Sequence, residues 1–117
     1  MSRMDRINQF MKREISSMIQ NDLQDPRLQF VTITNVDVSR DLSCARVHFS
    51  ALGGAQKEQS VLAALNSAKG LIRKMIGQRI RLRLTPDLEF FYDKSIEYSS
   101  QIEQALEEIR NENKKDH

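Results

Sequence analysis

The sequence predicts an α+β fold in which helices cover one face of a small mixed sheet. Apolar residues recur at helical spacing over residues 3–21 and 58–77, whereas they alternate with polar residues over 31–38, 45–51 and 79–84. The 117 residues fit one compact domain. No apolar run approaches the length needed to cross a bilayer, so no membrane association is expected.

The first helix is predicted over residues 3–21, where apolar side chains recur every three or four positions. These positions are Met4, Ile7, Met11, Ile15, Met18 and Ile19. Asp25-Pro26 marks the end of the helix, because the residue before a proline is disfavoured in the helical conformation.

Two strands are predicted next, over residues 31–38 and 45–51. The apolar phase of the first strand slips near Asn35, and a β-bulge is the economical explanation. Residues 40–43 are few enough for a hairpin loop, so the two strands should be antiparallel neighbours. His48 lies on the polar face of the second strand and is expected to be a surface base at a strand edge.

The second helix is predicted to begin near Glu58 and to end at Gly77. Its apolar stripe is interrupted at Ala68-Lys69-Gly70, where glycine favours a kink. Such a kink would let another backbone approach closely, and it would leave amide groups free at the start of the following helical segment.

The last predicted elements are a third strand over residues 79–84, more extended chain over 88–92, and a Glu-rich helix over 96–113. The third strand alternates without error and carries an arginine at every second position on one face. Pro86 interrupts the extended chain between the two segments.

Basic residues concentrate in the middle of the chain, although the formal net charge is only +2. Residues 57–83 hold seven basic residues and one acidic residue, which gives a local charge of +6. Residues 94–117 hold four basic residues and six acidic residues, which gives a local charge of −2. This asymmetry predicts a domain over residues 1–95 that meets a polyanion with one face. An acidic helix and tail, 96–117, would pack on that domain or trail from it.

The residue types expected at an enzyme, metal or nucleotide site do not come together. Cys44 and His48 share a strand face, but four residues of strand separate them by more than about 10 Å, too far to share a metal. No serine lies in a nucleophile motif, and no P-loop is present. The lone cysteine rules out an internal disulfide and favours the cytoplasm. We therefore expect neither an enzyme nor a cofactor.

The basic cluster predicts two candidate sites for the phosphates of RNA. The first is the kink with the two bases that follow it, although spacing alone favours a role in helix packing equally well. The second is the arginine stripe, which the neighbouring strand would extend. We expect the open sheet face to lack aromatic residues, with exposure of one member of the run 90–92 left open, and therefore expect recognition of backbone and shape. The candidate RNA-binding residues are Ala68, Lys69, Gly70, Arg73, Lys74, Arg79, Arg81, Arg83 and Arg46.

Several short motifs follow one another in a specific order along the chain. They include Asp25-Pro26-Arg27, Val31-Thr32-Ile33, Val38-Ser39-Arg40-Asp41-Leu42, Ala68-Lys69-Gly70, Leu71-Ile72-Arg73, Leu84-Thr85-Pro86-Asp87-Leu88 and Asp93-Lys94-Ser95. Each motif is unspecific by itself, whereas the collinear series over about residues 1–110 is highly specific. In this series the chain resembles the bacterial ribosome-binding factor A family.

The resemblance implies a type II KH-like fold: helix, strand, strand, kinked helix, strand, here with an added C-terminal helix. Ala68 to Gly70 would replace the usual G-x-x-G loop. It implies transient, non-catalytic binding to the free 30S ribosomal subunit during late maturation of 16S rRNA, at its 5′-end region, with importance in cold adaptation. The expected partners are the 30S subunit, 16S rRNA and ribosome-assembly GTPases, and the chain is expected to be a monomer without a cofactor.

Two other classes of function remain open from the residues alone. A protein–protein adaptor would use the acidic helix over residues 96–113 and would need the chain after Ser95, which an RNA-binding domain largely would not. An enzyme would need a pocket with perturbed titratable groups.

Overall fold

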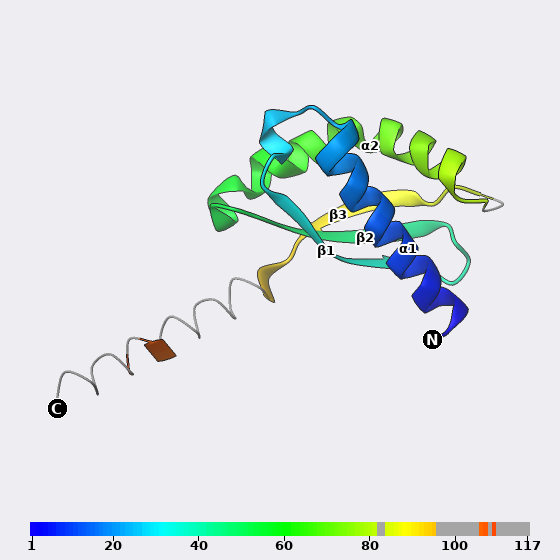
Figure 1. Cartoon of the computed structure of the whole chain (residues 1–117), viewed down its shortest axis with the longest axis horizontal. Coiled ribbons are helices and arrows are strands. Elements are labelled where there is room, and N and C mark those ends of the chain that lie inside the picture. Colours follow the sequence, from blue (N-terminus) through cyan, green and yellow to red (C-terminus); the bar gives the residue numbers. More distant parts are fainter. Residues whose placement is uncertain (82–83, 96–105, 108, 110–117) are drawn as a thin grey trace.

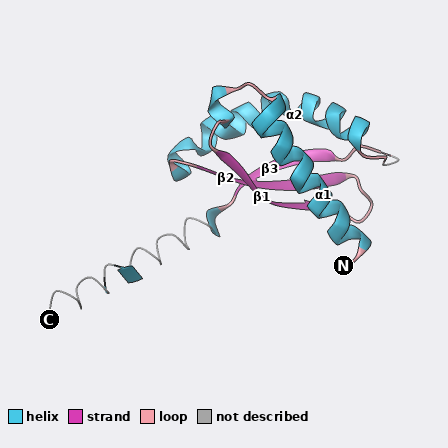
Figure 2. Cartoon of the chain, in the orientation of Figure 1, coloured by secondary structure: helices cyan, strands magenta, loops and turns pink. Residues whose placement is uncertain are grey.

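The computed structural model describes residues 1–81, 84–95, 106–107 and 109. Its main elements are α1 (Arg3–Ser17), β1 (Val31–Val38), β2 (Cys44–Ala51), α2 (Glu58–Arg79) and β3 (Asp87–Tyr92). Both helices lie against the three-stranded sheet, as Figures 1 and 2 show. The predicted α+β fold is confirmed.

The sheet is mixed, with β2 in the centre of the order β1-β2-β3. β1 runs antiparallel to β2, and β3 runs parallel to it. The register between β1 and β2 shifts between Ile33 and Asn35, which is the bulge that the slipping apolar phase predicts. The parallel pair needs a long crossover, and α2 provides it.

The loop between β1 and β2 is the short hairpin predicted from the sequence. The Asp41 carboxylate accepts hydrogen bonds from the Ser39 hydroxyl at 2.7 Å and the Ser43 hydroxyl at 2.8 Å. These bonds stabilise the charged form and lower the pKa of Asp41 to about 2. The loop is therefore closed by its own side chains.

One face of the sheet forms the core together with the helices. The buried set comes from both helices and all three strands and includes Met11, Ile15, Val36, Val47, Phe49, Leu65, Ile72, Leu88 and Phe90. Strand side chains alternate between faces, so the intervening residues of each strand point away from both helices. These are exposed on an open face, which carries Thr32, Asn35, Asp37, Arg46, Asp87, Glu89 and Phe91.

The open face of the sheet carries an aromatic pair. His48 lies on the central strand and not at an edge, and its ring stacks on Phe91 with centroids 5.6 Å apart. Phe91 is 42% exposed. The expectation of an edge position for His48 is therefore wrong, whereas Phe91 is the exposed member of the aromatic run 90–92, an alternative that the sequence left open.

Helix α1 begins with a capping box, in which Ser2 and Asp5 exchange hydrogen bonds between side chain and backbone. It continues into a π-helical turn, Met18–Asp22, so the helix predicted over residues 3–21 is confirmed. The predicted C-terminal helix lies outside the described residues, except that Leu106, Glu107 and Ile109 are helical and exposed. None of the described helices is long and apolar enough to span a membrane.

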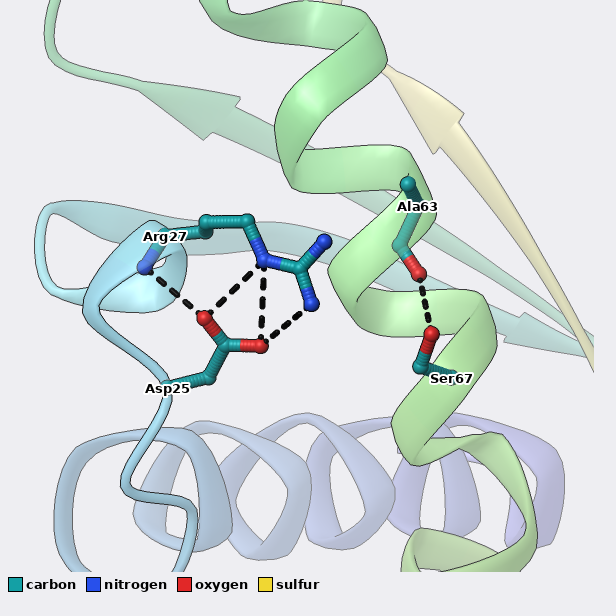
Figure 3. Close-up of polar contacts among 4 residues, drawn as sticks. All are labelled: Asp25, Arg27, Ala63 and Ser67. Atoms are coloured by element: carbon teal, nitrogen blue, oxygen red, sulfur yellow. Dashed lines mark hydrogen bonds and ion pairs between the residues drawn. The ribbon is translucent and has the colours of Figure 1, made fainter.

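Helix α2 bends without breaking. Its axis changes direction part-way along in Figure 1, yet helical structure is continuous from Glu58 to Arg79. The Ser67 hydroxyl donates to the Ala63 carbonyl at 2.9 Å (Figure 3), and Gly70 follows one turn later. Serine back-bonding and glycine both favour a bend in a helix. The predicted kink is thus a bend in one continuous helix.

Two details of the predicted helix are wrong. The amide groups near Gly70 are inside a continuous helix and donate within it, so no second helix N-terminus is present there. The helix also does not end at Gly77. It runs on to Arg79, and the Ile80 amide still donates to the Ile76 carbonyl at 2.8 Å.

The third strand is not where alternation placed it. Residues 79–81 finish the helix and leave it, and β3 is formed by Asp87–Tyr92, which pairs with β2 from Cys44 to Phe49. This segment buries Leu88 and Phe90 in the core, whereas Leu84 is 68% exposed. The later segment therefore occupies the position beside β2, and the extended chain predicted over 88–92 is confirmed.

Candidate nucleic-acid interface

Eight of the nine residues predicted to bind RNA lie in the described part of the chain, and these eight do not form one surface. Because residues 79–81 form the end of α2 and the chain that leaves it, Arg79 and Arg81 do not lie on one face of a strand. Arg81 is exposed and follows the end of α2, and Arg83 lies outside the described residues. Each base must therefore be placed by its own contacts.

Arg79 is neutralised by two acids from the N-terminal part of the chain. Its Nη1 lies 3.1 Å from Glu14 Oε2, and its Nη2 lies 3.0 Å from Asp22 Oδ2. The hydrogen bonds to Asp22 and then to Glu14 raise the pKa of Arg79. This guanidinium ties the end of α2 to the end of the first helix, so its charge is already matched.

The Arg73 side chain makes structural hydrogen bonds within the domain. Its Nε donates to the Pro86 carbonyl at 3.1 Å, and its Nη2 donates to the Thr85 carbonyl at 3.2 Å. These two carbonyls belong to the segment that leads into β3. Arg73 therefore anchors the beginning of β3 to α2, and only part of its guanidinium remains for a ligand.

Arg46 does not extend a basic patch. In the sheet register it lies between Asp37 on β1 and Glu89 on β3, and all three residues are exposed on the open face. Opposite charges placed side by side on neighbouring strands favour one another. A phosphate approaching Arg46 would therefore meet two carboxylates.

Ala68, Lys69, Gly70 and Lys74 lie together in the middle of α2. Lys74 and Gly70 are exposed, Ala68 and Lys69 are half-buried, and neither lysine forms an ion pair with a described residue. A Cβ added to Gly70 would meet no described atom within 4 Å apart from its chain neighbours and the backbone of its own helix, so the backbone there faces open space. These residues keep the features expected of a surface that a phosphate backbone approaches.

Bases on α1 also belong to the candidate interface, although they are not among the RNA-binding residues predicted from the sequence. Arg6, Lys12 and Arg13 are exposed and unpaired among the described residues, and the Arg13 guanidinium lies 6.0 Å from the Phe10 ring centroid. The signal was present in the sequence, because these bases fall opposite the apolar stripe of the helix.

Charge is separated between the two sides of the domain. The helical side carries unpaired bases on both helices, and two of its acids, Glu14 and Asp22, are occupied by Arg79. The open sheet face carries exposed carboxylates from β1 and β3. A polyanion is therefore attracted to the unpaired bases of the helical side and repelled by the carboxylates of Asp37, Asp87 and Glu89 on the open face.

No metal site is formed within the part of the chain that the structure describes, where no group of three or more His, Cys, Asp or Glu side chains converges. Cys44 is a free, half-buried thiol, and burial first, then Glu89, raises its pKa. A raised pKa makes the thiol less reactive, so Cys44 does not have the character of a nucleophile.

The comparisons with known proteins agree with this fold. The family model described as "Ribosome-binding factor A" matches residues 3–106. A crystal structure of ribosome-binding factor A from Thermus thermophilus is similar at 31% identity, with a TM-score of 0.70, and the match covers 78% of this chain and 97% of that one.

Two further solved structures are similar over most of the chain. One is a solution NMR structure of a putative ribosome binding factor A from Thermotoga maritima, at 33% identity and a TM-score of 0.63, covering 76% of this chain and 89% of that one. The other is a homology model of the Thermus thermophilus factor fitted into a cryo-EM map of a 30S–factor complex, at 32% identity and a TM-score of 0.62, covering 74% and 91%. The chain belongs to the ribosome-binding factor A family.

Proposed function

We propose that this chain is a ribosome-assembly factor that binds the free 30S subunit through the phosphates of 16S rRNA. Family membership supports this proposal, as does the relative fitted into a 30S complex. The single observation that carries it is the separation of charge, which leaves unpaired bases on the helical side and carboxylates on the open sheet face. We place the RNA-binding function in residues 1–95, with residues 96–117 appended to them.

The finer proposal concerns when and how the factor acts. It binds transiently during late maturation of 16S rRNA, near the 5′-end region, and matters most in the cold. It acts in the cytoplasm as a monomer, without catalysis or a cofactor, and ribosome-assembly GTPases are further partners. Within the domain, the contact surface is the middle of α2, where Lys69, Gly70 and Lys74 present two cations beside bare backbone.

Sedimentation of the purified chain with ribosomal particles tests the function. We expect co-sedimentation with free 30S subunits and not with translating 70S ribosomes, because an assembly factor leaves before translation begins. Binding should weaken steeply as salt rises from about 50 to 200 mM, since each neutralised phosphate releases counterions. Equal association with all particles, or binding that does not respond to salt, would contradict the proposal.

The variant Gly70→Ala distinguishes a purely structural role of this glycine from a role in RNA contact. Apart from its chain neighbours and the backbone of its own helix, the added methyl meets no described atom within 4 Å. Because alanine favours a helix over glycine by ~1 kcal/mol, the variant should be more stable to urea by up to that amount. If RNA approaches the bare backbone, the same methyl should weaken 30S binding by about fivefold, which corresponds to ~1 kcal/mol.

Ala63→Gly is the matched control, because it makes the reverse change at an exposed position of the same helix. It should lower stability by ~1 kcal/mol and leave RNA affinity unchanged. If Gly70 contacts RNA, the Gly70→Ala variant should bind the 30S subunit more weakly although its stability is higher. If affinity follows helix stability in both variants, Gly70 acts only through the helix.

A further inference from the structure

Two large apolar side chains stand side by side in solvent at one end of the sheet. Phe30 precedes β1 and is 61% exposed, and Leu52 follows β2 and is 72% exposed. The Leu52 amide donates to the Phe30 carbonyl at 3.1 Å, so the two residues extend the hairpin ladder by one step. Phe30 and Leu52 are called the ridge below.

A hollow lies on each side of the ridge. One has a volume of about 370 Å³ and the other about 600 Å³, and Phe30, Leu52 and their neighbours line both. Among the described residues, the smaller hollow is lined by two bases, Arg27 and Lys57, and by no acid. No charged residue of the described chain lines the larger hollow, whose described polar lining consists of Gln20, Gln29, Thr32, Ser50 and Tyr92 with the backbone of the loop after β2.

The loop after β2 positions Lys57. Gly53 has a φ of +101°, a conformation that L side chains rarely adopt. A Cβ there would lie only 2.9 Å from Lys57 Cγ. The missing side chain lets the stem of Lys57 lie on the loop, while the residue lines the smaller hollow.

Arg27 is fixed at the same hollow by its neighbour. Its Nε lies 3.1 Å from Asp25 Oδ1, and its Nη2 lies 2.7 Å from Asp25 Oδ2, as Figure 3 shows. One guanidinium nitrogen, Nη1, remains outside this pair. The pair is neutral overall, so Lys57 supplies the net charge of the hollow.

We propose that the ridge binds one unpaired nucleotide of RNA, with the base stacked on Phe30 over the neutral hollow and the phosphate in the hollow beside Lys57 and Arg27. The proposal rests on the proposed function, because it names a second contact for the same partner class. The apolar surface is small and contains one exposed ring, which suits a flat base better than a protein interface. Amide and hydroxyl groups in the neutral hollow suit the edge of a base.

This site is distinct from the middle of α2. Ser60, which lines the smaller hollow, precedes Gly70 by ten residues, or about 15 Å of helix. The two sites therefore contact different parts of the RNA. Variants at one of them leave the other in place.

The test uses the full-length chain and a short single-stranded RNA that contains 2-aminopurine, whose fluorescence is quenched when the base stacks. We expect the wild-type chain to quench this fluorescence. Phe30→Ala should weaken binding by about tenfold and remove the quenching, within the range for loss of one base–aromatic stack. Phe91→Ala is the matched control, since it removes another exposed aromatic ring. This variant should change neither the affinity for the RNA nor the quenching of its fluorescence.

Lys57→Gln tests the phosphate. It should lower the slope of log affinity against log salt by about one, whereas Phe30→Ala should leave the slope unchanged. Quenching that persists in Phe30→Ala, or that is lost in Phe91→Ala, would overturn the proposal.

Purified 30S subunits provide the last arm of the test. We expect Phe30→Ala to weaken binding to the subunits as well as to the oligonucleotide. If it weakened only subunit binding, the ridge would contact a ribosomal protein, and the nucleotide site would be rejected. Failure of the proposed function would be separate, because the wild-type chain itself would then not bind free subunits.

Discussion

Replacing Arg73 with alanine should lower the free energy of unfolding by about 2–3 kcal/mol, because it removes two hydrogen bonds from a charged donor to backbone carbonyls. The bonds join α2 to Thr85 and Pro86, and Pro86 is buried. The segment that leads into β3 would lose its anchor. Urea unfolding followed by circular dichroism gives the measurement, and the midpoint should fall with little change in slope.

Arg73→Lys is the control for charge. Lysine keeps the positive charge but cannot present the planar fork that reaches both carbonyls, so it should recover only part of the stability. RNA binding by each variant must be measured well below its unfolding midpoint. If Arg73→Ala unfolds like the wild type while 30S binding collapses, Arg73 is a phosphate contact and not an anchor.

Local sequence signals were sufficient for the elements whose determinants lie close together. The apolar spacing of α1, the hairpin between β1 and β2, and the bulge near Asn35 all depend on residues within a few positions of one another. Burial then reinforces the same pattern, because one face of each element enters the core. These predictions therefore survive without knowledge of the rest of the chain.

The position of β3 could not be obtained in this way. Residues 79–84 alternate more cleanly than Asp87–Tyr92, but among the described residues it is the segment Asp87–Tyr92 that pairs in parallel with β2. The choice depends on where α2 ends and how far the chain must travel back to the sheet. Alternation of apolar and charged residues indicates which face a strand would bury. It does not indicate whether a neighbouring strand is available for pairing.

The same limit applies to the candidate site, where the sequence gives the number of charged residues but not the groups that each of them contacts. The number of bases in the middle of the chain predicted a basic domain, but their pairing depends on residues far away in sequence. Arg79 finds Glu14 and Asp22, which lie 65 and 57 positions earlier. Arg73 finds two carbonyls 12 and 13 positions later. A charge count gives no information about such partners.

Replacing both Lys69 and Lys74 with glutamine should weaken binding to the 30S subunit by about 30-fold at moderate salt, which corresponds to ~1 kcal/mol for each lost phosphate contact. Both lysines are unpaired among the described residues, so stability should change by less than about 0.5 kcal/mol. The slope of log affinity against log salt should become shallower by about 1.5–2.

Arg79→Gln is the matched control for that double variant, because it also removes a cation from α2 but one already paired with two acids. It should lower stability and leave the salt slope unchanged. A second comparison is the double variant with Arg6→Gln and Arg13→Gln, which removes the same number of positive charges from α1. If the slope falls for the α1 pair and not for the lysines, the RNA crosses α1 and the middle of α2 is not the contact. If both pairs lower it, the two helices share one phosphate-binding side, as the separation of charge across the domain predicts.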